Sequence, residues 1–155
     1  MTPAIDALKK AGMVFRIHEY QHDPQNRSYG EEAATMLGID GHRVFKTLIL
    51  SQDHHNFYVA VLPVACQLDL KHFAKIVGAK KIALTDKSAA QRMTGYIPGG
   101  VSPIGQKRTL PTIIDRTATD FDTIFVSAGR RGLEIELSPD DLCILTRARF
   151  ETIGH

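Results

Sequence analysis

The run of residues 44–50, Val-Phe-Lys-Thr-Leu-Ile-Leu, constrains the fold of this chain more than any other stretch. Its aliphatic, aromatic and β-branched side chains predict a buried β-strand. Side chains alternate between the two faces of a strand, so Lys46 shares a face with Val44 and Leu48. An ammonium group there needs a partner or access to solvent, because an unpaired buried charge is costly. Lys46 is therefore either an edge-strand charge that opposes aggregation or a side chain that faces a ligand in a cleft.

Capping and turn residues divide the rest of the chain into short helices and strands. Helices are expected over residues 70–77 and after the capping residues Thr2, Ser28, Asp86 and Ser138. Further strands are expected over residues 14–20, 57–62, 82–84, 109–114, 123–126 and 133–137. Strands outnumber helices and residues 43–62 form a hairpin. We therefore expect one α+β domain over residues 1–155, with a curved, mainly antiparallel, barrel-like mixed sheet and flanking helices.

Composition excludes several classes of protein. A net charge of only +2 excludes a strongly electrostatic, sequence-blind nucleic-acid binder, although it allows a local basic patch. Cys66 and Cys143 lie far apart in the sequence and form no redox motif or disulfide framework. The N-terminus is not a signal peptide and no apolar run reaches the ~20 residues of a membrane span, so we expect a cytoplasmic protein.

A second unusual stretch is the glycine-rich loop, residues 95–105, which contains four glycines and two prolines. Glycines allow positive φ angles and let a ligand approach main-chain amides closely. The loop matches neither a Walker motif nor a dinucleotide fingerprint, and it could also be a tight connection. Clustered basic residues usually indicate a solvated surface, but their placement on both sides of the loop is also consistent with a local anionic partner, RNA above all: Lys71, Lys75, Lys80, Lys81, Lys87, Arg92, Lys107 and Arg108.

A third stretch, residues 126–129, places Ser127 before a glycine turn at the expected end of a strand. Its hydroxyl could face a ligand or solvent. Glu134 shares a strand face with Glu136, and a solvated face is the ordinary interpretation of both. The seven histidines are scattered and no Gly-x-Ser-x-Gly elbow is present. We therefore expect no metal and no cofactor.

Residues 44–48, 95–105 and 126–137 closely resemble the corresponding motifs of the YbaK proteins. These are free-standing aminoacyl-tRNA deacylases similar to the editing domain of bacterial prolyl-tRNA synthetase. The resemblance covers essentially the whole chain in the same order. It implies the YbaK editing-domain fold with a cleft, and trans-editing hydrolysis of mischarged Cys-tRNA(Pro). The implied partners are the acceptor end of tRNA(Pro) and prolyl-tRNA synthetase.

The resemblance also implies a mechanism and a set of site residues. In this family the cysteinyl thiolate attacks its own ester carbonyl, so the protein supplies positioning and electrostatics without a metal or a nucleophile of its own. The essential lysine falls on Lys46. Substrate-binding positions fall on Tyr20, Tyr29, Thr47, Gly99, Gly100, Ser127 and Glu134. Relatives usually have Phe in place of Tyr29 and Asp in place of Glu134, and the extra methylene of Glu134 leaves the detailed pocket geometry open.

Two alternatives remain at the level of the sequence. A deacylase of the same fold could prefer Ala-tRNA(Pro), and pocket volume would distinguish it. A tRNA-binding or synthetase-binding module without catalysis is the other alternative, and the presence of Lys46 at the expected position argues against it.

Overall fold

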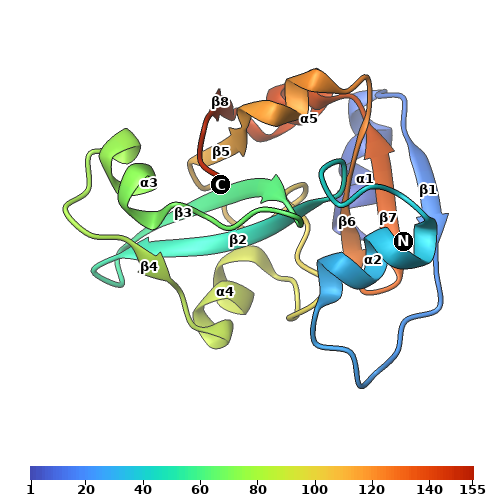
Figure 1. The fold of residues 1–155 in the computed structure, drawn as a ribbon, viewed down its shortest axis with the longest axis horizontal. Helices are drawn as coiled ribbons and strands as arrows, with labels where there is room; N and C mark the ends of the chain where they lie inside the picture. The colour runs from blue at the N-terminus through green and yellow to red at the C-terminus, as the bar shows by residue number, and fades with distance from the viewer.

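The computed structural model describes residues 1–155 and contains two β-sheets (Figure 1). The larger has the strand order β4-β2-β3-β5-β8 and the smaller has the order β1-β7-β6. The larger sheet contains β2 (Phe45–Gln52), β3 (Asn56–Pro63), β4 (Ala83–Leu84), β5 (Thr112–Asp115) and β8 (Arg149–Glu151). The smaller sheet contains β1 (Arg16–Glu19), β6 (Ile124–Arg130) and β7 (Leu133–Leu137). The α+β class is confirmed, but the sheets are open and do not form a barrel.

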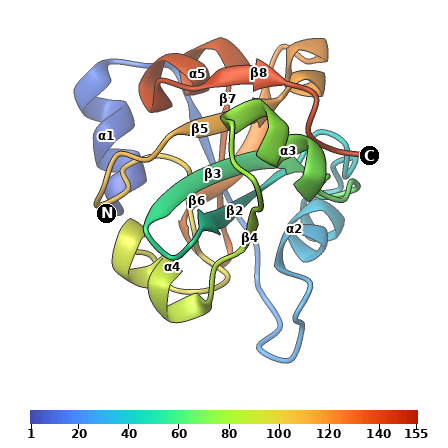
Figure 2. The ribbon, with the colours of Figure 1, turned by 90° about the vertical axis from the view of Figure 1, so that its left-hand side faces the viewer.

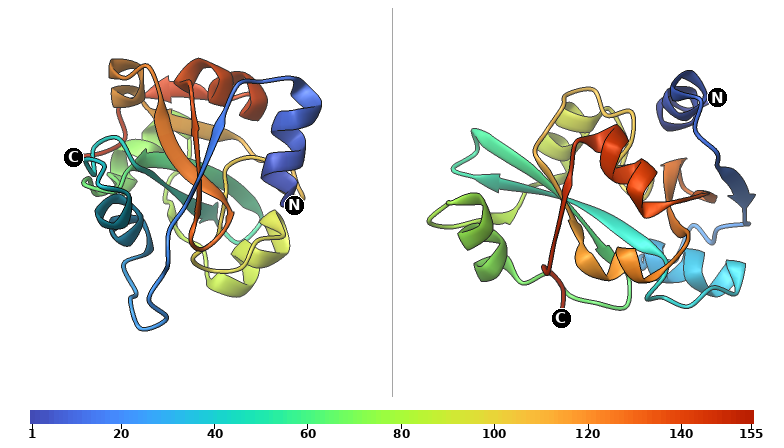
Figure 3. Two further views of the ribbon diagram at one scale, coloured as in Figure 1. Left: turned by 90° about the vertical axis from the view of Figure 1, so that its right-hand side faces the viewer. Right: turned by 90° about the horizontal axis from the view of Figure 1, so that it is seen from above.

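Five short α-helices lie around the outside of the sheets (Figures 2 and 3). They are α1 (Pro3–Ala11), α2 (Tyr29–Leu37), α3 (Leu70–Val77), α4 (Lys87–Thr94) and α5 (Pro139–Thr146), and a 3-10 helix, η1, covers Arg116–Asp120. No helix combines the length and the apolar character needed to cross a membrane. The sequence predicted all five α-helices but neither η1 nor β8.

Local capping explains why most helix boundaries were predictable. The side chains of Thr2, Asp69, Asp86 and Ser138 each accept a hydrogen bond from a backbone amide in the first turn of the following helix. Ser28 before α2 differs, because its side chain makes no capping hydrogen bond. Ser28 therefore does not act as the expected capping residue, and it instead lines a cavity beside α2.

The hairpin of β2 and β3 is confirmed, with Lys46 opposite Leu62. Four strand pairs are antiparallel, as expected, whereas β5 pairs in parallel with both β3 and β8. The short strand β4 pairs with β2 only at Leu50 and Ser51. The segment of β2 around Lys46 therefore has β3 on one side and no extended strand partner on the other.

The two sheets join where the chain enters β2. Val44 forms an isolated bridge with Phe125 of β6, and the Phe125 amide donates to the Arg43 carbonyl over 3.1 Å. Ala33 and Ala34 of α2 pack on this junction together with Val44 and Phe125. Burial of these apolar side chains holds the N-terminal end of α2 above the start of β2.

The structure corrects the expected turn at residues 127–129. Strand β6 continues through Ser127 to Arg130, and its pairing with β7 is irregular between those two residues. Gly129, at a φ of +99°, makes this irregularity possible. Ser127 thus lies inside a bulged strand, directly opposite Glu134.

Candidate active site

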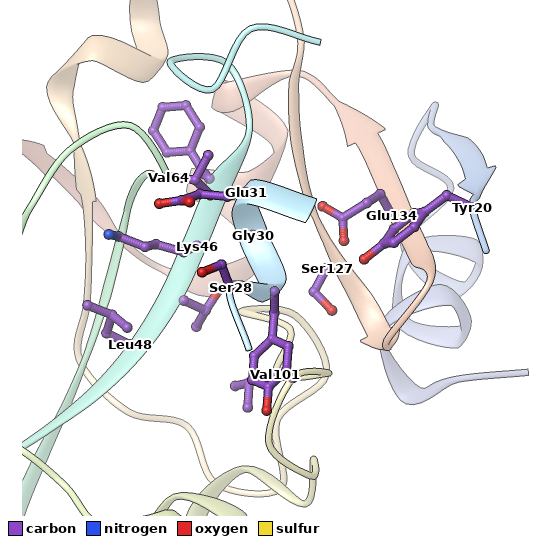
Figure 4. A pocket seen from close by; sticks show the side chains of 14 residues that line it. Tyr20, Ser28, Gly30, Glu31, Lys46, Leu48, Val64, Val101, Ser127 and Glu134 are labelled. Atoms are coloured by element: carbon purple, nitrogen blue, oxygen red, sulfur yellow. The ribbon is translucent and has the colours of Figure 1, made fainter. Parts of the chain in front are cut away.

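A cavity of about 300 Å³ is lined by residues of α2, β2, β6 and β7 and by the glycine-rich loop (Figure 4). The structure brings seven of the eight residues predicted from the resemblance to its wall: Tyr20, Tyr29, Lys46, Thr47, Gly99, Ser127 and Glu134. Sequence reasoning missed the other residues of the wall: Ser28, Gly30, Glu31, Phe45, Leu48, Val64 and Val101. Four of these seven directly adjoin Tyr29, Lys46 or Thr47 in the chain, which was the available signal.

Gly100 is the predicted site residue that the structure places elsewhere. It is buried, and its amide donates to the Ile97 carbonyl over 3.0 Å, so this amide is already used within the loop. A Cβ atom at Gly100 would lie 3.1 Å from the Arg130 Cα and 3.2 Å from the Arg131 nitrogen. Gly100 therefore allows the glycine-rich loop to pack closely on the end of β6.

We expect Gly100→Ala to lower the free energy of unfolding by about 1–3 kcal/mol, because an added methyl group meets backbone that cannot move freely. The larger side chain of Gly100→Val should cost more and should lower stability and activity together. Thermal unfolding of each variant beside the wild type measures the effect. An unchanged melting temperature for Gly100→Ala would show that the loop is not held against Arg130 in this way.

Lys46 has the partner that an ammonium group on an apolar strand face requires. Its Nζ donates to the Cys66 carbonyl over 2.6 Å, and the side chain is half-buried. Burial lowers the pKa of Lys46, while the nearby Glu31 carboxylate is among the groups that oppose this shift. An ammonium group has three N–H donors. Since Lys46 makes one hydrogen bond within the protein, two donors remain for an anionic or carbonyl oxygen of a ligand.

Glu134 contributes a buried acid on the other side of the cavity from Lys46 (Figure 4). It is only 6% exposed, and burial raises the pKa of its carboxyl group to about 8. The carboxyl group takes part in none of the ion pairs of the structure. The solvated face expected for Glu134 is therefore wrong, whereas Glu136 on the same strand is partly exposed and pairs with Arg43.

This buried acid predicts an unusual dependence of stability on pH. Between the ordinary glutamate pKa of 4.5 and the folded value of about 8, the native state keeps a proton that the unfolded chain has lost. Stability should therefore fall as pH rises through this interval, by up to ~1.4 kcal/mol per pH unit. Glu134→Gln removes the titration, so its melting temperature should exceed that of the wild type at pH 8, and the difference should shrink toward pH 5. A difference that grows toward pH 5 would contradict the assignment.

The aromatic side chains of the cavity wall, Tyr20 and Tyr29, contact residues both inside and outside the wall. The ring of Tyr29 lies against Gly99, where a Cβ atom would be 3.4 Å from three ring atoms. The guanidinium carbon of Arg131 lies 4.6 Å from the centre of the same ring. The pKa of Tyr20 is raised, first by burial and then by the charge of Glu134. Arg131 was not among the residues that the sequence predicted for the site.

The hydroxyl groups of the cavity do not form a nucleophilic centre. Ser127 accepts a hydrogen bond from the Gly129 amide over 3.1 Å, and no histidine lines the cavity to activate it. The Thr47 hydroxyl is buried without a hydrogen-bond partner. No group of three or more His, Cys, Asp or Glu side chains is placed to hold a metal ion. The arrangement is suited to binding and orienting a ligand that carries charge at two points.

Of the basic residues expected to contact an anionic partner, the structure brings Lys80 and Lys81 together at a second hollow. Lys80 and Lys81 line a second hollow with residues 51–54 at the far end of β2, and neither contributes to the wall of the first cavity. These lysines remain a candidate contact for an anionic partner at a distance from the cavity.

Comparison with known proteins identifies the family. The family model described as an aminoacyl-tRNA editing domain matches residues 23–144. This chain belongs to that family. The resemblance to the YbaK proteins is thereby confirmed. The matched range of the editing domain contains every residue of the cavity wall except Tyr20.

Individual relatives agree with this assignment. The chain is 37% identical over 152 residues to a protein of Enterococcus faecalis provisionally named Cys-tRNA(Pro)/Cys-tRNA(Cys) deacylase EbsC, covering 98% of this chain and 92% of that one. Its fold matches the crystal structure of hypothetical protein APE2540 with a TM-score of 0.88 and 24% identity, covering 99% and 100% of the two chains. It also matches a structure provisionally described as a trans-editing enzyme for prolyl tRNA synthetase, with a TM-score of 0.86, 21% identity and coverage of 99% and 95%.

Proposed function

We propose that this editing domain is an aminoacyl-tRNA deacylase that hydrolyses mischarged Cys-tRNA(Pro) in trans. The observation that carries the proposal is the cavity itself, with the Lys46 ammonium group and the buried Glu134 carboxyl group both in its wall. The provisional name of the Enterococcus relative supports the same substrate class. The function requires the acceptor end of tRNA(Pro) as a partner, and prolyl-tRNA synthetase as the source of the error.

A separate editing site is needed because the two amino acids are similar in bulk. A difference of one methylene in an apolar pocket discriminates by only ~1–3 kcal/mol. A synthetase for proline therefore also attaches cysteine to tRNA(Pro), and a second site must remove it.

The Lys46 ammonium group and the Glu134 carboxyl group match two parts of an aminoacyl ester. The free donors of Lys46 would hold the terminal phosphate or the ester carbonyl oxygen. Glu134 would accept the α-amino group of the amino acid. A free α-amino group has a pKa of about 8, and burial raises the pKa of Glu134 to about 8. The two groups can therefore share one proton, which avoids leaving an isolated charge in the cavity.

The reaction would proceed without a nucleophile from the protein. The cysteinyl sulfur forms a bond to the ester carbonyl carbon, the ester C–O bond breaks, and the thiol proton passes to the departing tRNA hydroxyl oxygen. The cyclic thiolactone that forms is opened by water to cysteine. Intramolecular attack of this kind reaches effective molarities of ~10⁵ M or more when the two groups are correctly oriented. Burial raises the pKa of the Cys66 thiol, which makes the protein's own nearby sulfur a poor nucleophile.

Incubation with purified Cys-tRNA(Pro), Ala-tRNA(Pro) and Pro-tRNA(Pro) tests the proposal. We expect rapid loss of cysteine, slower loss of alanine and little loss of proline, measured as the fraction of tRNA that stays acylated. Preferential cleavage of Ala-tRNA(Pro) would identify the same fold with the alternative substrate. Binding of all three without cleavage would identify a non-catalytic module.

A further inference from the structure

Arg131 lies outside the cavity wall but holds several of its parts together. It occupies the turn between β6 and β7, three residues before Glu134. Its Nη2 donates to the carbonyl oxygens of Asp23 and Asn26. The same nitrogen lies 3.2 Å from a carboxylate oxygen of Glu32 on α2, in an ion pair whose side chains are 18% and 4% exposed. One guanidinium group thus binds two points of the segment 21–28 and one point of α2.

Glu32 contacts the segment 21–28 as well as Arg131. Its second carboxylate oxygen accepts a hydrogen bond from the Asp23 amide over 2.9 Å. Arg131 and Glu32 therefore hold the main chain at Asp23 through both its N–H and its C=O groups. Charge-assisted hydrogen bonds among buried groups are stronger than ordinary ones. The segment 21–28, which protrudes beside α2 in Figures 2 and 3, is tied to the body of the protein by these contacts at Asp23 and Asn26.

The connection extends to both aromatic residues of the cavity. The guanidinium carbon of Arg131 lies 4.6 Å from the centre of the Tyr29 ring, a cation–π distance. The carbonyl of the adjacent Gly132 accepts a hydrogen bond from the Tyr20 amide over 3.0 Å. The turn of residues 130–132 therefore contacts the two tyrosines between which the segment 21–28 runs.

We propose that Arg131 is a positioning residue that holds the segment 21–28 and the Tyr29 ring against the cavity and so sets which aminoacyl group fits. The inference deepens the proposed deacylase function and rests on it for its substrate. Arg131 touches no reacting atom. It acts through Tyr29, whose ring forms cavity wall, and through the chain that leads into α2. Nη2 of the guanidinium group contacts the two carbonyls and the carboxylate while the planar face of the group lies on the Tyr29 ring, and a lysine ammonium can reproduce this arrangement only in part.

Arg131→Gln tests the inference with Arg130→Gln as a matched control. Arg130 is the adjacent residue, is exposed and forms no ion pair, so its replacement removes the same charge without loosening the segment. The first readout needs no substrate: trypsin cleavage of the native protein after Arg27, an exposed residue of the segment, followed by mass spectrometry. We expect Arg131→Gln to raise this cleavage rate about tenfold or more, as loss of two or three hydrogen bonds implies. Arg130→Gln should leave the rate unchanged.

The second readout is selectivity. Arg131→Gln should lower kcat/KM for Cys-tRNA(Pro) and raise the relative cleavage of Pro-tRNA(Pro), because a displaced Tyr29 ring widens the cavity. Arg131→Lys should restore part of both effects. Arg131→Gln with wild-type cleavage after Arg27 and wild-type selectivity would overturn the inference.

Two further outcomes distinguish failure of the Arg131 inference from failure of the proposed deacylase function. If Arg131→Gln does not fold, Glu32→Gln tests the same connection from α2 and should also raise cleavage after Arg27, and failure to do so would overturn the inference. If the wild type cleaves none of the three tRNAs, the proposed function fails, while the trypsin result still decides whether Arg131 holds the segment.

Discussion

Lys46→Ala is expected to remove nearly all deacylation of Cys-tRNA(Pro) and to leave the fold intact. The ammonium group lines the cavity, is held by the Cys66 carbonyl over 2.6 Å and keeps two free donors. Loss of an electrostatic contact to the reacting ester typically costs about 10²–10³ in rate. Single-turnover deacylation with the variant in excess measures this loss directly.

The controls for Lys46 separate charge from packing. Lys46→Met keeps most of the aliphatic stem, so it should be as inactive as Lys46→Ala if the ammonium group matters. Lys46→Arg should also be poor, since the larger planar group does not fit a site for a compact charge. Lys9→Ala, which removes an exposed lysine from α1, should deacylate Cys-tRNA(Pro) at the wild-type rate. If Lys46 served only to protect a strand edge, its loss would change stability by no more than about 0.5 kcal/mol and leave activity unchanged.

Ser-tRNA(Pro) is expected to be cleaved at least about 100-fold more slowly than Cys-tRNA(Pro), because a hydroxyl group is far less ionised than a thiol near neutral pH and is a weaker nucleophile. Serine and cysteine differ by one atom, so binding in the cavity should be similar for both. The comparison therefore isolates the chemical step from recognition. Rates with both tRNAs, measured under the same single-turnover conditions, provide the test.

The protein's own sulfurs provide the control for this result. Cys143→Ala and Cys66→Ala should both retain activity, the second because Lys46 is held by the main-chain carbonyl of Cys66 and not by its thiol. Mass spectrometry should detect the cyclic thiolactone or cysteine beside free tRNA. Equal rates for the two tRNAs would show that the substrate thiol is not the nucleophile, and attack by water assisted by Ser127 or Glu134 would have to replace the substrate-assisted route.

Glu134 is one of two positions, with Tyr29, at which the resemblance implies a departure from the usual residue of the family. Its extra methylene extends the carboxyl group further into the cavity than an aspartate would reach, and its burial keeps the acid mostly protonated near neutral pH. Glu134→Asp should thus change discrimination between amino acids of different size more than it changes the chemical step. Relative rates with the Cys, Ala and Pro forms of the tRNA would measure this change.

The sequence by itself determined the secondary-structure elements that depend on local interactions. Thr2, Asp69, Asp86 and Ser138 cap helices with hydrogen bonds to residues three positions away, so local spacing is sufficient to predict them. The apolar run of residues 44–50 predicted strand β2, because its aliphatic, aromatic and β-branched side chains are typical of a buried strand. With the family resemblance, the sequence also supplied seven residues of the cavity wall.

Only the tertiary structure decided which side chains are buried and which distant residues they contact. Glu134 looks like half of a solvated face in the sequence, yet it is buried in the cavity wall where α2, β2 and the glycine-rich loop meet β7, whereas Glu136 on the same strand is partly exposed. Gly100 was predicted to face a ligand, and only the tertiary structure shows that it also packs against the backbone of Arg130. Arg131 looks like a turn residue, yet it joins segments about 100 residues apart in the chain. Burial, close backbone approach and long-range ion pairs depend on which distant segments meet, and local spacing in one sequence carries no information about that.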